Sequence, residues 1–255
     1  MSNDAILRVE NISKAFGGVR AVDEVTLSVK RGSITGLIGP NGSGKSTLFN
    51  VISGVEKKDS TGAIEFDGKR IDQLSPHKRF ELGLGRSFQT PRLFMGMTVL
   101  ENTMLAAKGQ KGERPSVAPF PSRWEGQEIE LAKRAQDQMM QLEIEQLYGK
   151  LPNETSGGQM KLVQLSNAMM GDPKMLLLDE PTAGVAPRLA QDIFKSIAHE
   201  REQLGTTFFI VEHRLEVLFK HVDTVFAMHQ GKIIAEGKPE SIVKDQKLID
   251  AYLGS

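Results

Sequence analysis

The chain has 255 residues, and its 32 lysines and arginines balance 32 aspartates and glutamates, so the formal net charge at neutral pH is zero. This length allows a sizeable hydrophobic core, and 39% hydrophobic with 25% charged residues is typical of a globular protein. Because the net charge is zero, no global field favours nucleic acid as the main partner. The absence of cysteine excludes disulfides, thiolate nucleophiles, iron–sulfur clusters and cysteine-based zinc sites.

We expect neither an N-terminal targeting segment nor a membrane-spanning segment. The first residues lack a basic stretch followed by an apolar one, so no signal peptide is predicted. The longest apolar runs, such as 175–178 and 208–211, are far shorter than the ~20 residues that cross a bilayer. We therefore expect a soluble, cytosolic chain that can act at a membrane only through a partner.

The first part of the chain is expected to be rich in strands. Period-two patterns over 6–9 and 25–29 predict two strands with a turn at Gly17-Gly18. The apolar segment 33–38 predicts a buried strand that runs into a glycine-rich loop and then a helix up to Gly54, which is a typical C-cap. Further on, Asp67-Gly68 between two short apolar segments predicts a tight hairpin.

A helical region and a second set of strands follow. Apolar residues at helical spacing predict a long helix over 131–142 and another after 157–158. Apolar runs then predict strands, with a helix between the first two of them, over 175–178, 206–211 and 222–228. A strand–helix–strand order predicts right-handed crossovers and a parallel sheet, hence an α/β fold. The segment 239–253 is expected to be helical.

The glycine-rich loop carries the strongest chemical signal. Residues 39–46 read Gly-Pro-Asn-Gly-Ser-Gly-Lys-Ser, which matches G-x-x-x-x-G-K-[S/T] between a predicted strand and a predicted helix. Such a loop turns its backbone N–H groups toward phosphate oxygens, and the helix N-terminus adds positive dipole. Lys45 is expected to contact the β- and γ-phosphates, and the Ser46 hydroxyl to bind Mg²⁺. A glycine turn with a chance lysine is disfavoured by the strand–loop–helix context.

Two acidic residues end the predicted strand 175–178. Open parallel sheets bind ligands at the carboxyl ends of their strands, where Asp179 and Glu180 lie. Asp179 is expected to hold Mg²⁺ through water, and Glu180 to polarise the attacking water as general base. A strand end of this kind can also be a plain helix cap, but the phosphate loop favours the catalytic interpretation.

The segment Thr155-Ser-Gly-Gly-Gln159 narrows the class of nucleotide hydrolase. Ser156 and the two glycines after it predict an anion-binding helix start, although an ordinary N-cap has the same residues. With Gln89 and His213 in the same order, the chain resembles the ATP-binding cassette (ABC) ATPases over nearly its whole length. The resemblance implies a P-loop NTPase core with a mixed or parallel sheet, an antiparallel β subdomain and an inserted α-helical subdomain. The implied organisation is a single domain 1–255, with a core of 1–89 and 173–237, a helical subdomain of 90–172 and a C-terminal helical tail of 238–255.

The resemblance also implies a role for each matching residue, with ATP and Mg²⁺ as cofactors. Phe16 would stack on adenine, Gln89 would contact Mg²⁺ and the attacking water, and His213 would meet the γ-phosphate. The implied catalytic residues are Lys45, Gln89, Glu180 and His213. The implied nucleotide contacts are Phe16, Gly39, Pro40, Asn41, Gly42, Ser43, Gly44, Lys45, Ser46, Thr47, Gln89, Ser156, Gly157, Gly158 and Gln159. The implied metal contacts are Ser46, Gln89 and Asp179.

The family resemblance implies partners as well. Two cassettes pair head to tail, as a homo- or heterodimer, and sandwich ATP between the phosphate loop of one and the signature serine of the other. Integral membrane permease subunits and, indirectly, a periplasmic or extracellular substrate-binding protein would complete the system, with no nucleic acid. The expected location is the cytoplasmic face of the inner or plasma membrane.

Several segments resemble the larger ATP-binding subunit of branched-chain amino acid importers, namely 86–94, 97–102, 183–187, 233–237 and 251–254. The lipopolysaccharide-export ATPases and importers of urea or other amides share much of this pattern. A soluble ABC ATPase switch is the alternative of another class, but such proteins usually carry two cassettes or a long coiled-coil insertion. Two residues depart from the family pattern, Thr155 where leucine is usual and Ala186 where aspartate is usual.

Overall fold

The structure is a computed structural model that describes residues 4–87, 92–244 and 246. The chain divides into two compact units. The first comprises 1–89, 174–183 and 197–255, and the second comprises 90–173 and 184–196. The expected core included 184–196, which the structure instead has in the second unit.

The first unit contains an antiparallel sheet with the strand order β2-β1-β4-β5. Its strands are β1 (Ala5–Phe16), β2 (Val19–Lys30), β4 (Ala63–Phe66) and β5 (Lys69–Arg70). The predicted turns at Gly17-Gly18 and Asp67-Gly68 are confirmed, and all four residues have positive φ. The first two strands are longer than predicted because shifts in the β1–β2 register interrupt the period-two pattern.

The second sheet of this unit has six strands in the order β10-β9-β3-β8-β7-β6. These are β3 (Ile34–Ile38), β6 (Leu84–Arg86), β7 (Met175–Asp179), β8 (Thr207–Val211), β9 (Thr224–His229) and β10 (Lys232–Gly237). All neighbouring pairs are parallel except β9–β10. Every residue of β3, β7 and β8 is buried, which explains their continuous apolar runs.

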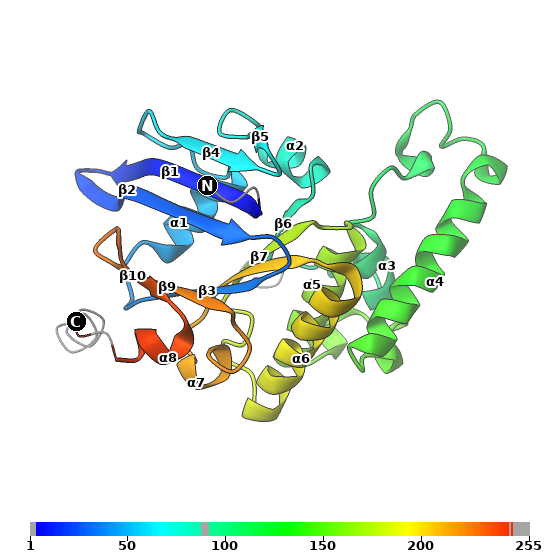
Figure 1. Cartoon of the computed structure of the whole chain (residues 1–255). Coiled ribbons are helices and arrows are strands. Elements are labelled where there is room, and N and C mark those ends of the chain that lie inside the picture. The colour runs from blue at the N-terminus through cyan, green and yellow to red at the C-terminus, as the bar shows by residue number, and fades with distance from the viewer. Residues whose placement is uncertain (1–3, 88–91, 245, 247–255) are drawn as a thin grey trace. The chain divides into compact units, whose positions relative to one another are not determined.

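The helix that follows the glycine-rich loop packs between the two sheets. Helix α1 (Lys45–Ser53) contacts strands of both sheets (Figure 1) and buries Leu48, Phe49, Val51 and Ile52. The Phe49 ring lies 5.0 Å from the Phe209 ring of β8, centroid to centroid. The expected α/β class, with a parallel sheet and a separate antiparallel sheet, is confirmed.

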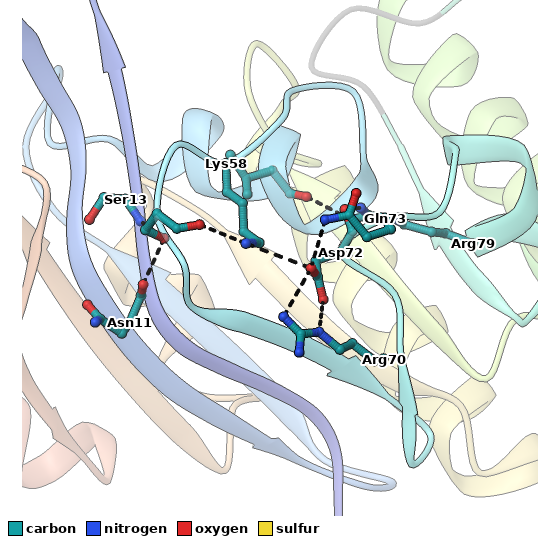
Figure 2. A network of polar contacts seen from close by, with 9 residues as sticks. Asn11, Ser13, Lys58, Arg70, Asp72, Gln73 and Arg79 are labelled. Carbon is teal, nitrogen blue, oxygen red and sulfur yellow. Dashed lines mark hydrogen bonds and ion pairs between the residues drawn. The ribbon is translucent and has the colours of Figure 1, made fainter.

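The C-terminal end of α1 is held by Arg79, which belongs to the network of polar contacts in Figure 2. Helix α2 (Pro76–Glu81) places the Arg79 guanidinium against the carbonyl oxygens of Val51 and Ile52, at 2.8 and 2.6 Å. Burial lowers the pKa of Arg79 to about 10, so it remains protonated at neutral pH. Beside it, the fully buried carboxylate of Asp72 accepts a hydrogen bond from Arg70 Nε at 2.7 Å.

Two further ion pairs connect the sheets of the first unit. Asp67, in the hairpin turn between β4 and β5, binds both Arg31 and Lys174. These two cations hold the pKa of Asp67 below its usual value, Lys174 contributing most.

Two short helices complete the unit, α7 (Leu215–Leu218) and α8 (Pro239–Ile242). The tail helix predicted over 239–253 begins as α8, which ends at Ile242, and residues 245 and 247–253 lie outside the described residues.

The second unit is helical, as predicted for this part of the chain. Its helices are α3 (Val99–Met104), α4 (Glu125–Gln141) and α5 (Gly157–Met170), and it contains the start of α6 (Pro187–Leu204). Ala135 and Met139 of α4 are buried, and the buried Asn102 side chain donates to the carbonyl oxygens of Phe94 and Met97. None of the helices in the described residues is long and apolar enough to cross a membrane.

Candidate functional site

The glycine-rich loop lies between β3 and α1, and its glycines adopt conformations that other residues rarely reach. Gly39, Gly42 and Gly44 all have positive φ. A Cβ atom on Gly39 would lie 2.0 Å from the carbonyl oxygen of Met228, and one on Gly44 would lie 1.9 Å from that of Ala21. Gly44 is also the N-cap of α1 and supplies no side-chain acceptor, so the first N–H groups of the helix remain available to an anion.

Lys45 occupies the floor of this loop. Its side chain is buried, and Nζ donates to the carbonyl oxygens of Gly39 and Pro40 at 2.8 and 2.9 Å. Burial lowers the pKa of Lys45, while the nearby carboxylates of Glu180 and Asp179 oppose this shift. A buried ammonium that is held only by neutral oxygens of its own loop is well placed to exchange them for phosphate oxygens.

Asp179 ends strand β7 beside the start of α1. Its Oδ1 atom lies 3.5 Å from the Ser46 hydroxyl, and its Oδ2 atom lies 3.6 Å from Nη2 of Arg86 on β6. Burial raises the pKa of Asp179, and the Arg86 charge is the largest opposing effect. The Arg86 guanidinium also donates to Ser53 at the end of α1, at 2.9 Å. Arg86 therefore connects the helix, the carboxylate and the strand that leads toward Gln89.

Glu180 and His213 meet at the ends of two adjacent strands. Strands β7 and β8 pair Asp179 with Val211, and the Glu180 N–H donates to the Val211 carbonyl oxygen at 2.9 Å. His213 Nε2 lies 2.9 Å from Glu180 Oε1. The two side chains are 37% exposed for His213 and 16% exposed for Glu180, so both can be reached from the solvent.

Several of these residues line a cavity of about 340 Å³. Its lining residues are Ala21, Asn41, Gly42, Gly44, Lys45, Ser46, Thr47, Glu180 and His213. The structure thus brings the glycine-rich loop together with the acidic end of β7, which is more than 130 residues away in the sequence. A volume of this order is sufficient for a small phosphorylated ligand.

The oxygen atoms at this cavity fit Mg²⁺ better than a transition metal. Ser46 and Asp179 supply a hydroxyl and a carboxylate, which are hard ligands, and they lie side by side. Within the described residues, no group of three His, Cys, Asp or Glu side chains could hold a metal ion on its own. Two protein oxygens next to a phosphate loop match the way Mg²⁺ is usually bound, through few carboxylates, phosphates and water.

Some of the expected site residues do not line this cavity. Phe16, at the end of β1, is 47% exposed beneath the Lys14 ammonium, 5.1 Å from the ring centroid, and is not among the lining residues. Gln89 lies outside the described residues. Ser43 is buried, and its hydroxyl lies 3.3 Å from Lys45 Nζ.

The segment Ser156–Gln159 lies in the second unit, at the start of α5. Ser156 is the N-cap, and it forms a reciprocal capping box with Gln159, at 3.3 and 2.9 Å. Ser156 and Gly157 are exposed, and a Cβ atom on Gly157 would meet nothing within 4 Å. By contrast, a Cβ atom on Gly158 would lie 2.4 Å from the end of the Leu189 side chain, which would have to move to admit it.

Three residues near the cavity were not predicted from the sequence: Ala21, Arg86 and Glu212. Ala21 lines the cavity from β2, and the other two are polar side chains that are almost completely buried. Glu212 directly precedes His213, so the sequence shows that it lies next to a candidate site residue. No motif indicates that its side chain is buried.

The chain is similar to known proteins over most of its length. A family model described as ABC transporter matches residues 22–183. A probable branched-chain amino acid transport ATP-binding protein, LivG, of Methanocaldococcus jannaschii is 44% identical over 253 residues, which cover 98% of this chain and 97% of that protein. The lipopolysaccharide export system ATP-binding protein LptB of Escherichia coli K12 is 33% identical over 250 residues, which cover 98% of each.

Solved structures give the same result. The ADP conformation of MJ1267, an ATP-binding cassette of an ABC transporter, has a TM-score of 0.84 at 42% identity and covers 98% of this chain and 99% of that chain. A dimeric post-hydrolysis state of the ATP-binding cassette MJ0796, bound to ADP and phosphate, has a TM-score of 0.77 at 25% identity and covers 91% of this chain and 98% of that chain. The chain therefore belongs to the ABC transporter family, in which it is an ATP-binding cassette that hydrolyses ATP.

Proposed function

We propose that this cassette drives the import of branched-chain or related amino acids through partner membrane subunits. The observation that carries the proposal is the cavity lined by Lys45, Ser46 and the Glu180–His213 pair, with Asp179 lying 3.5 Å from the Ser46 hydroxyl. The amino-acid specificity is supported by the similarity to LivG, 44% identical, against 33% for LptB. A substrate-binding protein and permease subunits would select the cargo, because this cavity has the chemistry of a phosphate site.

In the proposed mechanism, the loop 39–47 surrounds the ATP phosphates with its N–H groups. Lys45 exchanges the carbonyl oxygens of Gly39 and Pro40 for the β- and γ-phosphates. Ser46 and Asp179 would hold Mg²⁺, which when bound neutralises phosphate charge. Gln89 is a further proposed ligand of the metal.

Glu180 is the proposed general base. It accepts the proton of the attacking water as the water oxygen bonds to the γ-phosphorus and the bond from that phosphorus to ADP breaks. In the structure His213 contacts the Glu180 carboxylate. We propose that His213 turns to the γ-phosphate when ATP binds, which leaves Glu180 free to orient the water.

Two copies, or one copy and a related cassette, are proposed to close head to tail around ATP. Ser156 and Gly157 are exposed at the N-terminus of α5, where backbone N–H groups suit an anion. Phosphate contacts from this segment to a nucleotide in the partner subunit would join the two cassettes. Hydrolysis and phosphate release would then part them and transmit the motion to membrane subunits on the cytoplasmic side.

The proposal is tested by reconstitution. The tagged chain is purified from detergent-solubilised membranes, and the co-purifying integral membrane proteins are identified by mass spectrometry. In proteoliposomes, the complex should take up labelled leucine in an ATP-dependent manner, and a Glu180→Gln complex should not. Recovery without any integral membrane protein would refute a transport role.

Lipopolysaccharide export is the second candidate, because LptB matches over 98% of the chain. ATP-dependent release of lipopolysaccharide without leucine uptake by the same complex would replace amino-acid import with this function. Uptake of urea or another amide alone would retain import but correct the substrate class.

A further inference from the structure

Glu212 is a buried carboxylate between the two loops that carry Glu180 and His213. The residue is 1% exposed and directly follows β8. Its Oε1 atom accepts hydrogen bonds from the Thr182 N–H, at 2.8 Å, and from the Thr182 hydroxyl. Its Oε2 atom accepts from the N–H groups of His213 and Arg214, at 2.9 and 3.2 Å. Both oxygens are thus engaged, one by each loop.

The position of these donors matters for the proposed reaction. Thr182 lies two residues after Glu180, and His213 is the next residue after Glu212. Beyond the ladder of β7 and β8, the Glu180 N–H still bonds to the Val211 carbonyl oxygen. Both strands end at this point, and beyond it the hydrogen bonds of the Glu212 carboxylate connect the loop after β7 with the loop after β8.

The chemistry of the contact requires a carboxylate. Four donors converge on two oxygen atoms, and an ionised carboxylate offers only acceptors. A glutamine of the same shape would direct an NH₂ group at one pair of donors and lose two of the four hydrogen bonds. Such a change would release one loop while keeping the volume of the side chain.

We infer that Glu212 is a positioning residue for ATP hydrolysis, which holds the Glu180 and His213 side chains at contact distance through the backbone of both loops. This inference rests on the proposed roles of Glu180 and His213. Glu212 is not among the lining residues of the cavity, so it acts through these two side chains and not on the nucleotide. A displacement of about 1 Å at reacting groups commonly costs on the order of a hundredfold in rate.

The test compares Glu212→Gln with a matched control, Asp72→Asn. Asp72 is also a fully buried carboxylate, bound by Arg70 and Gln73 (Figure 2), and none of these residues lines the cavity. In Glu212→Gln we expect kcat to fall about 30- to 100-fold while the Kd for ATP changes less than about threefold. In Asp72→Asn we expect lower thermal stability with kcat unchanged.

A second variant covers the case in which Glu212→Gln does not fold. Thr182→Val removes the hydroxyl donor and keeps the N–H donor, and it should lower kcat about threefold at unchanged ATP affinity. The ¹H–¹³C resonance of the His213 ring should shift in either variant and stay in place in Asp72→Asn.

The outcomes distinguish a failure of the proposed catalytic site from a failure of the proposed role of Glu212. If Glu180→Gln turns over at the wild-type rate, the proposed catalytic site itself is wrong. If Glu180→Gln is inactive while Glu212→Gln and Thr182→Val keep wild-type kcat, only the role of Glu212 is overturned. The role of Glu212 is also overturned if kcat and ATP affinity fall together, or if Asp72→Asn loses as much kcat as Glu212→Gln, because both results indicate a general effect on folding.

Discussion

Replacing Lys45 with methionine should weaken nucleotide binding far more than it weakens folding. In the structure, Nζ donates to the carbonyl oxygens of Gly39 and Pro40, and these bonds can be exchanged for phosphate contacts. Two hydrogen bonds to a charged group, at about 1.5 kcal/mol each, amount to about 3 kcal/mol. At about 1.4 kcal/mol per tenfold change, the Kd for nucleotide should rise about 150-fold. The free energy of unfolding should change by less than about 1 kcal/mol, because the loss of these hydrogen bonds is offset by the removal of a buried charge. The cost of burying that charge is seen in the lowered pKa of Lys45.

Isothermal titration with a non-hydrolysable ATP analogue, which carries both the β- and the γ-phosphate, measures this effect without interference from hydrolysis. The matched control is Lys58→Met, because Lys58 is 11% exposed, donates to the Ser60 carbonyl oxygen at 2.7 Å and does not line the cavity. Lys58→Met should bind the analogue as the wild type does. A Kd for Lys45→Met within about threefold of the wild type would refute the assignment of the phosphate loop, and an equal loss in both variants would show that the effect is not local.

Three further substitutions test the structure around the site. Arg79→Met removes the donors that bind the last-turn carbonyl oxygens of α1, so the free energy of unfolding should fall by about 3 kcal/mol. Urea titrations measure this loss, and a change below about 0.5 kcal/mol would contradict the prediction. Gly44→Ala puts a Cβ atom 1.9 Å from a carbonyl oxygen of β2, so ADP binding measured by titration should be lost, and retained affinity would show that the loop relaxes freely. Asp67→Asn keeps a residue that tolerates positive φ but removes the charge that binds its two cations. Since these cations lower the pKa of Asp67, its contribution is present above the unfolded pKa, near 3.8, and disappears as the pH falls through the lower folded value. Thermal melts should therefore show a less stable Asp67→Asn at pH 7 and a difference from the wild type that shrinks as the pH falls below 3.8, whereas a constant difference would exclude the ionic cause.

The sequence was sufficient for elements whose signal is local. Strands β3, β7 and β8 were predicted because they are buried on both faces and therefore continuously apolar. Strand β6 was missed because its three residues include Gly85 and Arg86, which carry no apolar pattern. Strand β10 was missed as well, since it lies at the edge of its sheet and is only partly buried.

The site divides in the same way. The glycine-rich loop and the Asp179–Glu180 strand end are each contiguous in the sequence, so their residue types and spacing were sufficient to propose a role for both segments. The roles of Arg86 and Glu212 depend on contacts with Asp179 and Thr182, which are 93 and 30 residues away in the chain. A single polar residue carries no sign that its side chain will be buried, so no local pattern predicts such contacts. The helix-cap interpretation of Ser156 and its proposed role toward nucleotide are compatible, because the cap leaves Ser156 exposed.

The central claim is that Glu180 is the base that activates water for the ATP held by the loop 39–47. The most direct measurement is single-turnover release of γ-phosphate by Glu180→Gln and by the wild type, at saturating ATP and at the same nucleotide occupancy. The amide keeps the shape of the side chain but cannot accept the proton, so we expect ATP affinity within about threefold of the wild type and phosphate release at least about 100-fold slower. Phosphate release by Glu180→Gln at the wild-type rate would contradict the account.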